Sequence, residues 1–248
     1  MRYHADNSCV IPNGIDVEQF GPSPKAYFKL RKDLHLGSSA VMIGLLGRYH
    51  PVKDHANFLR AAASVVAVKP DSHFLLAGSG VNEKNQELIR LIDEQNLTGR
   101  VHLLGEREDT ADLMAALDIF ALSSFEESCP NVIGEAMACG VPCVVTDVGD
   151  AALIIGDTGR VVPSGNSPAL ATALIELLEL GHVGRRALGV TARTRVMELF
   201  TLESSVAQYE SLYKSMVPQE QAGEISIVDP VDVAGSWEPN LIHGSDSV

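Results

Sequence analysis

The sequence predicts an α/β fold, a doubly wound parallel sheet of the Rossmann-like kind. Short runs that are apolar throughout alternate with longer stretches whose apolar residues recur at helical spacing, which is the pattern of strands that crossover helices bury on both faces. Hydrophobic residues make up 46% of the 248 positions, so the chain can bury a sizeable core. At about 150 residues per domain, this length allows one large domain or two small ones.

The alternation begins at residue 41. Five short apolar runs are the predicted strands: residues 41–46, 74–77, 101–104, 119–122 and 141–145. Four amphipathic stretches between them are the predicted helices: residues 54–68, 83–95, 109–116 and 132–138. Three further helices are expected at about residues 168–180, 183–199 and 202–215. Gly181 and Gly184 are expected to separate the first two of these.

The two ends of the chain depart from this pattern. Residues 1–24 contain a Pro-Asn-Gly turn signal and then a stiff Gly-Pro-Ser-Pro stretch, which predicts a segment that leads into the sheet domain. Residues 217–248 contain six acidic residues and no Lys or Arg, without helical periodicity, and predict a mobile acidic tail. The expected organisation is a leading segment (1–24), a sheet domain (25–200), a final helix (201–216) and the tail.

Charge and missing motifs exclude several classes of function. The chain has 19 Lys and Arg against 32 Asp and Glu, a net charge of −13, which argues against binding to nucleic acid or to an anionic membrane. No run approaches the roughly 18 apolar residues of a membrane span and no secretory signal is visible, so the expected location is the cytoplasm. The motifs H-E-x-x-H, D-x-D and G-x-S-x-G and the P-loop are absent. The four cysteines are expected to stay reduced, and Cys139 and Cys143 are expected to be buried thiols without a zinc site.

In a doubly wound sheet, ligands bind beyond the carboxyl ends of the strands, so residues that follow each run are the candidates. Gly47 and Arg48 follow the first run, and Lys53 stands five residues after Arg48. Glycine allows close backbone approach, and an Arg with a Lys suits a diphosphate; the alternative is two solvated cations beside a loop. After the second run, Glu83 stands where a dinucleotide fingerprint would need its third glycine, which favours a plain flexible loop there.

The segment after the fourth run carries the most specific pattern. Ser128 is a candidate helix cap and Pro130 suits the first helical position. The amides of Asn131 and Val132 would then point outward at a helix N-terminus, which is a natural seat for phosphate oxygens.

Two carboxylates flank this seat. Glu135 lies about one turn into the predicted helix, and Glu127 lies in the loop before it. A carboxylate does not favour a phosphate, so beside one it is expected to accept hydrogen bonds from hydroxyls such as those of a ribose. The alternative is that Glu135 only satisfies the helix dipole and that Glu127 only faces solvent.

Seven residues separate Glu127 from Glu135, and the sequence Glu-Ala-Met-Ala-Cys-Gly-Val-Pro starts at Glu135. This block resembles the signature of retaining GT-B glycosyltransferases of the glycogen-synthase-like family-four type. Further matches stand in the family's order on both sides: residues 10–16 with Phe20, Gly47-Arg48 with Lys53, residues 76–80 and residues 158–163. The resemblance covers about residues 9–213, and residues 148–152 depart from it.

The resemblance implies a role for each candidate residue. Arg48 and Lys53 would neutralise the leaving nucleoside diphosphate in place of a metal ion, so neither a metal nor another cofactor is expected. Glu135 would hold the ribose, and Glu127 would hold a hydroxyl of the sugar. The remaining contacts would come from Gly47 beside the diphosphate, from Asn131 and Val132 through their amides, and from Gly105 and Arg107 at the base.

The family has two Rossmann-like lobes with the active site between them, and the resemblance places this chain in the C-terminal, donor-binding lobe. Residues 1–24 would be the interlobe segment, residues 25–200 the nucleotide-sugar-binding domain, and residues 201–216 a helix that crosses back to the other lobe. The apolar face of that helix is expected to be exposed. An N-terminal lobe or a partner subunit is therefore an expected partner, and the histidines receive no catalytic role.

The expected function is the donor-binding half of a retaining, metal-independent hexosyltransferase. The donor would be a UDP-, GDP- or ADP-sugar and the acceptor a growing glycan or a lipid-linked saccharide, with any membrane contact made through the other lobe. One alternative is a non-catalytic module or subunit that binds a nucleotide sugar and requires a separate acceptor lobe. A flavodoxin-like or dehydrogenase domain is a weaker alternative, because the glycine fingerprint fails.

Overall fold

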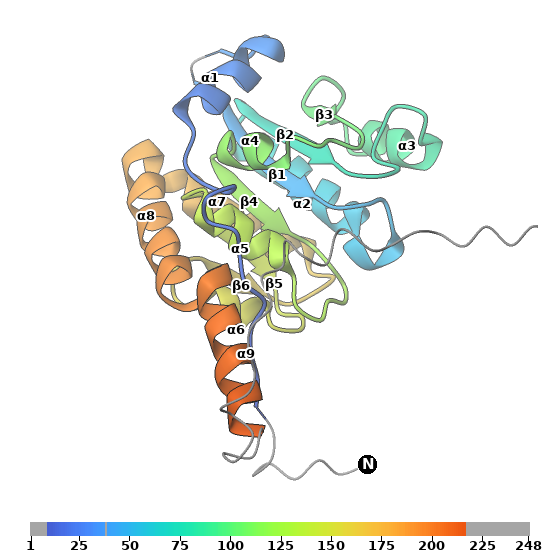
Figure 1. Cartoon of the computed structure of the whole chain (residues 1–248). Coiled ribbons are helices and arrows are strands. Elements are labelled where there is room, and N and C mark those ends of the chain that lie inside the picture. Colours follow the sequence, from blue (N-terminus) through green and yellow to red (C-terminus); the bar gives the residue numbers. More distant parts are fainter. Residues whose placement is uncertain (1–8, 38, 217–248) are drawn as a thin grey trace, which may run out of the picture. The chain divides into compact units, whose positions relative to one another are not determined.

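The computed structural model describes residues 9–37 and 39–216 (Figure 1). They belong to two compact units, of which the first ends at Ala207 and the second begins at Gln208. The first unit holds the whole sheet and every described helix except the last part of α9 (Leu202–Met216).

The first unit is built on a six-stranded parallel sheet in the order β3-β2-β1-β4-β5-β6 (Figure 1). The strands are β1 (Val41–Leu46), β2 (Ser72–Ala77), β3 (Val101–Leu103), β4 (Ile119–Leu122), β5 (Cys143–Thr146) and β6 (Arg160–Val162). The predicted fold class is confirmed. Since the chain proceeds outward from β1 on one side and returns to pair β4 on the other, the strand order reverses between β1 and β4, where such sheets form their ligand crevice.

Helices cover both faces of the sheet. They are α1 (Pro24–Asp33), the 3-10 turn η2 (Pro51–Lys53), α2 (His55–Val68), α3 (Gln86–Glu94), α4 (Thr110–Ala115), α5 (Asn131–Ala138), α6 (Ala151–Ile155), α7 (Ser167–Glu179), α8 (Gly181–Leu199) and α9. Alternate residues of each strand point to opposite faces. Met42 and Leu46 of β1 join the core beneath α5 and α8, whereas Ile43 and Leu45 join the core beneath α2 and α7.

Two predictions about local structure are wrong, and α1 was not predicted. The Gly-Pro-Ser-Pro stretch is the start of α1 and not only a linker, because the Ser23 side chain accepts a hydrogen bond from the Ala26 amide at 3.2 Å and Pro24 opens the helix. Gly184 lies inside α8, and only Gly181, at a φ of +64°, marks the break from α7. The short elements α6 and β6 were not predicted.

The segment before α1 is fixed against α5 and against the start of α9. The Ile15 amide donates to the Phe200 carbonyl at 2.8 Å, and the Leu202 amide donates to the Ile15 carbonyl at 3.0 Å. The Ile15 side chain lies against Gly134 of α5, where a Cβ would come within 2.7 Å of it. The segment therefore holds the start of α9 beside α5.

Cys139 and Cys143 are buried free thiols, as expected, whereas Cys9 is exposed and Cys129 is partly buried. Burial raises the pKa of Cys139 to about 12, which keeps that thiol protonated.

At the start of α9, Leu202 and Val206 are 46% and 48% exposed, as expected for an uncovered apolar face. Within the described ranges, none of the helices is long and apolar enough to cross a membrane, and the predicted tail, residues 217–248, lies outside those ranges.

Candidate functional site

The loops after β1 and β4 meet at the crevice and place Lys53 beside Glu127. The Lys53 ammonium lies 2.5 Å from Glu127 Oε1, and the same oxygen accepts a hydrogen bond from the Ser124 hydroxyl at 2.7 Å. The two loops are tied together, because the Phe125 amide donates to the Val52 carbonyl at 2.7 Å and the Ser123 hydroxyl to the Lys53 carbonyl at 2.8 Å. With only 19% and 15% of their side chains exposed, Lys53 and Glu127 form a well-positioned ion pair.

Glycines bring the loops after β1 and β2 into direct contact. Gly78 has a φ of +146°, and a Cβ there would stand 2.2 Å from the Gly47 carbonyl oxygen, so no larger residue fits. At Gly47, the Lys53 side chain passes 3.5 Å from the position that a Cβ would take. Arg48 beside it is exposed and makes no hydrogen bond or ion pair with the residues that the structure describes. Gly47 thus supports the Lys53 stem, and the Arg48 guanidinium is unengaged at the same crevice.

The N-terminus of α5 opens beside Glu127 without a side-chain cap. Pro130 occupies the cap position and α5 begins at Asn131, so the expectation that Pro130 opens the helix and Ser128 caps it is wrong. Asn131 Oδ1 accepts a hydrogen bond from the Asn13 side chain at 3.0 Å. The amides of Asn131 and Val132 have no intrahelical partner at this end, so they are free to donate to an anion.

Glu135 is a half-buried carboxylate without a partner. It makes no hydrogen bond or ion pair with any residue in the described ranges, and its burial raises its pKa. A carboxylate in this state gains from hydroxyl donors, because each hydrogen bond that it accepts offsets the water it has lost.

Gly105 and Arg107 follow β3, which β2 and β1 separate from β4. Gly105, at a φ of +66°, accepts a hydrogen bond from the Gly78 amide at 2.8 Å, which links its loop to the one after β2. Arg107 forms two hydrogen bonds to Asp109, at 2.7 and 2.6 Å, which raise the pKa of Arg107 and lower that of Asp109. The structure therefore joins Gly105 to the glycine loops but directs Arg107 to its own neighbour.

Gly149 is a site residue that sequence reasoning left unassigned. Its φ is +49°, and a Cβ there would stand 2.2 Å from the Ser128 carbonyl oxygen, while the Asp150 amide donates to that oxygen at 2.9 Å. The loop after β5 therefore packs against the backbone of the loop that carries Glu127. The only available signal was a glycine within the segment that departs from the family pattern.

His55 lies next to the crevice and is neutral. It is 3% exposed at the start of α2, and neither ring nitrogen has a hydrogen-bond partner among the described residues. Burial, together with the nearby Lys53 charge, lowers the pKa of His55 from 6.5 to about 4. Across the described ranges, groups of three acidic, cysteine or histidine side chains suited to a metal ion are absent.

Replacing His55 with leucine is expected to flatten the dependence of stability on pH between pH 4 and pH 7. Because the pKa of His55 is lower in the folded protein, the unfolded chain binds the proton more tightly, so the free energy of unfolding falls as the pH drops. A shift from 6.5 to about 4 corresponds to a loss of about 3 kcal/mol at pH 4. Denaturant titrations of both proteins at several pH values measure this, and parallel curves for the two would contradict it.

Comparison with known proteins places these features in a family. A family model described as "Glycosyl transferases group 1" matches residues 40–180. The chain is 32% identical over 208 residues to the N-acetyl-alpha-D-glucosaminyl L-malate synthase of Bacillus anthracis, covering 81% of this chain and 54% of that one. It is 30% identical over 226 residues to the D-inositol 3-phosphate glycosyltransferase of Corynebacterium jeikeium, covering 87% and 53%. The chain thus spans about half the length of the curated relatives that it matches.

Solved structures with a similar fold are also known. The chain is similar to the Anabaena protein HepE in complex with UDP, with a TM-score of 0.78 and 28% identity over 86% of this chain and 58% of that one. HepE has also been solved in complex with UDP-glucose. Over the matched region, the parallel sheet described above is therefore similar to that of HepE, which has been solved with a bound nucleotide sugar.

Proposed function

Because the chain belongs to the Glycosyl transferases group 1 family, we propose that it is the donor-binding half of a retaining, metal-independent hexosyltransferase. The observation that carries the proposal is the Lys53–Glu127 pair, which lies where the strand order reverses and next to the open N-terminus of α5. This arrangement offers positive charge and free amides for phosphate, together with carboxylates for hydroxyls, within one crevice.

The diphosphate is bound by Arg48, Lys53 and the amides of Asn131 and Val132. The Lys53 ammonium has three N–H donors and uses one of them on Glu127, so it can hold Glu127 and a phosphate oxygen at the same time. As the bond from the anomeric carbon to the phosphate oxygen breaks, negative charge grows on the departing diphosphate, and these cations and amides stabilise it. They take the part that a metal ion plays in other transferases.

The two carboxylates bind different hydroxyls of the donor. Glu135, half-buried and unpartnered, accepts from the ribose, and Glu127 accepts from the sugar through Oε2, the oxygen that Lys53 and Ser124 leave open. Gly105 and Arg107 contact the base. Arg107 can do so only by sharing its guanidinium with Asp109 or by leaving it.

The donor is a UDP-, GDP- or ADP-sugar, and UDP-glucose is the first to test because the similar protein HepE binds it. The acceptor is a growing glycan or a lipid-linked saccharide. Since the names of the two relatives point to malate and inositol phosphate, small polar acceptors belong in the same panel.

Replacing each carboxylate separately tests the division of roles. Glu135→Gln is expected to weaken UDP and UDP-glucose alike, by about tenfold, because both ligands carry the ribose. Glu127→Gln is expected to remove the extra affinity of UDP-glucose over UDP without weakening UDP. Calorimetric titration measures both, with Glu126→Gln, an exposed neighbour, as the matched control. Equal weakening of the two ligands by Glu127→Gln would show that the assignment of Glu127 to the sugar is wrong.

A further inference from the structure

A cavity lies at the amino ends of the parallel strands, opposite to the carboxyl ends that carry the proposed donor residues. It has a volume of about 730 Å³ and is lined by residues of α1 and α8 together with Asp118 and Pro142. Asp118 and Pro142 immediately precede β4 and β5, so they stand at the amino ends of these strands. The donor residues follow the carboxyl ends, and none of them lines this cavity.

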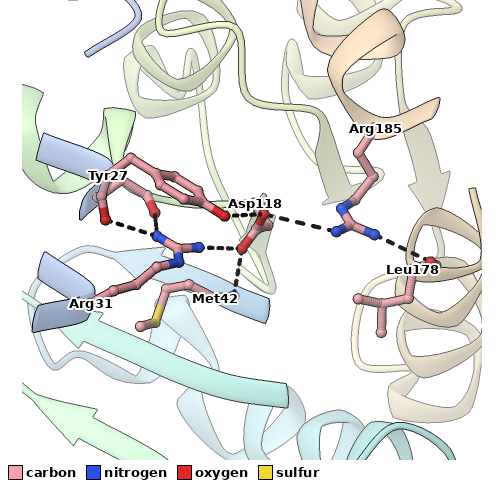
Figure 2. A network of polar contacts seen from close by, with 7 residues as sticks. Tyr27, Arg31, Met42, Asp118, Leu178 and Arg185 are labelled. Atoms are coloured by element: carbon pink, nitrogen blue, oxygen red, sulfur yellow. Dashed lines mark hydrogen bonds and ion pairs between the residues drawn. The ribbon is translucent and has the colours of Figure 1, made fainter. Parts of the chain in front are cut away.

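One wall of the cavity contains a buried group of charges with an excess of positive charge (Figure 2). Asp118 Oδ2 accepts hydrogen bonds from the Arg31 guanidinium at 2.5 Å and from the Met42 amide at 2.8 Å. Arg185 approaches the other carboxylate oxygen from α8, on the far side of Asp118 from Arg31. Arg31 and Arg185 are 6% and 7% exposed and Asp118 is 9% exposed, so two buried cations share one buried anion.

Arg185 is the less satisfied of the two arginines: Arg31 and Arg185 each have a buried Nε without a partner among the described residues, but the Arg31 guanidinium makes three other hydrogen bonds and that of Arg185 only one. Its NH1 donates to the Leu178 carbonyl at 3.2 Å, but its NH2 lies 3.8 Å from Asp118 Oδ1, beyond hydrogen-bond distance. Its buried Nε has no partner within the described ranges. Buried guanidinium N–H groups without acceptors are costly, and a ligand oxygen in the cavity would satisfy them.

Further basic side chains of α8 line the same cavity. His182, Arg185, Arg186 and Arg193 recur at intervals of three, one and seven residues, which places them on one face of the helix. Arg193 is engaged by the Ala138 and Phe20 carbonyls, whereas Arg186 is exposed and has no partner among the described residues. Three arginines against Asp118 and Glu198 leave the lining with a formal excess of one positive charge, in a chain of net charge −13.

The rest of the lining is apolar. Phe28 of α1 is 69% exposed, and Val190 and Met197 of α8, seven residues apart, are 60% and 46% exposed. Large apolar side chains that stay exposed around a cavity mark a site for an apolar group. We infer that this cavity binds a small amphipathic anion, with its phosphate or carboxylate group on Arg185 and Arg186 and its apolar body between Phe28, Val190 and Met197.

Calorimetric titration with 1-naphthyl phosphate and 1-naphthoate tests this inference, with 1-naphthol and inorganic phosphate as partial ligands. At least one of the two anions is expected to bind with 1:1 stoichiometry and at least tenfold more tightly than either partial ligand. The anion that binds more tightly shows whether the preferred head group is a phosphate or a carboxylate. Failure of both anions to bind at millimolar concentration would overturn the inference.

Two variants of the cavity and one control variant test where the anion binds. Arg186→Gln and Val190→Asp change exposed positions, so they are expected to fold, and each should weaken the anion at least fivefold. Arg60→Gln, an exposed arginine on α2, should leave it unchanged. Added UDP should not displace the anion. Unchanged affinity in both cavity variants, or displacement by UDP, would place the anion elsewhere and overturn the inference, whether or not UDP itself binds as proposed above.

Discussion

Lys53→Met is expected to weaken the binding of UDP at least tenfold. A charge-assisted contact to phosphate contributes about 1.5–3 kcal/mol, which corresponds to roughly 10- to 150-fold in affinity. The variant also leaves the Glu127 carboxylate, 15% exposed, without its counter-ion and beside the phosphates. Repulsion between these anions adds to the lost attraction, so this effect is expected to exceed that of Arg48→Ala, which removes a cation without exposing an anion.

The ion pair makes this prediction testable by a double-mutant cycle. Combining Lys53→Met with Glu127→Gln removes the stranded charge, and part of the lost affinity for UDP is expected to return. Lys32→Met, at an exposed position on α1, is the control for the loss of one positive charge. If UDP binds to Lys53→Met and to Arg48→Ala as tightly as to the unaltered chain, neither cation holds the diphosphate.

The second large effect concerns catalysis. Under the proposed function, the 248-residue chain is expected to bind its donor but to transfer sugar only at the background rate, because it would supply the diphosphate contacts while another lobe would supply the acceptor contacts. Orientation of the acceptor hydroxyl accounts for about 7–11 kcal/mol of the barrier, or roughly five to eight orders of magnitude in rate. Fusing a matching N-terminal lobe ahead of Val10 is expected to restore transfer with retention of the anomeric configuration.

The assay for this effect follows release of UDP together with the glycosylated acceptor, whose anomeric configuration is read by NMR. A fusion protein that carries Lys53→Met and Glu127→Gln is the control for the donor crevice. Efficient turnover by the unfused chain would mean that it contains a complete active site. A fusion protein that binds donor with an intact crevice but transfers nothing would favour the non-catalytic module.

Much of the sheet was predictable because its strands are buried on both faces. The residues of β1 are apolar from end to end, so composition alone marked residues 41–46, and the structure gives the same bounds. β6 was not predicted, because it has only three residues, begins with Arg160 and lies at the edge of the sheet. Only Val162 of this strand is buried. α1 was not predicted at all, because Gly-Pro-Ser-Pro also suits a linker, and only the contact between Ser23 and Ala26 shows that a helix begins there.

The position of Lys53 and Glu127 at the carboxyl ends of β1 and β4 was predictable, but their pairing was not. The rule for doubly wound sheets pointed to the residues after β1 and β4, and Lys53 and Glu127 lie there. They are 74 residues apart in sequence, so no spacing could show that the ammonium of one neutralises the carboxylate of the other. Gly149 was missed for a related reason, because its need for glycine arises from the Ser128 carbonyl, which belongs to another loop.

The most direct test of the donor crevice is a calorimetric titration of the unaltered chain with UDP-, GDP- and ADP-glucose in the presence of a chelator. The arrangement of Arg48, Lys53, Glu135 and the α5 amides predicts that one of the three binds at a single site, and that adding Mg²⁺ instead of the chelator leaves its affinity unchanged. If none of them binds without a divalent cation, or if none binds at all, the central claim that this crevice holds a nucleotide sugar without metal is wrong.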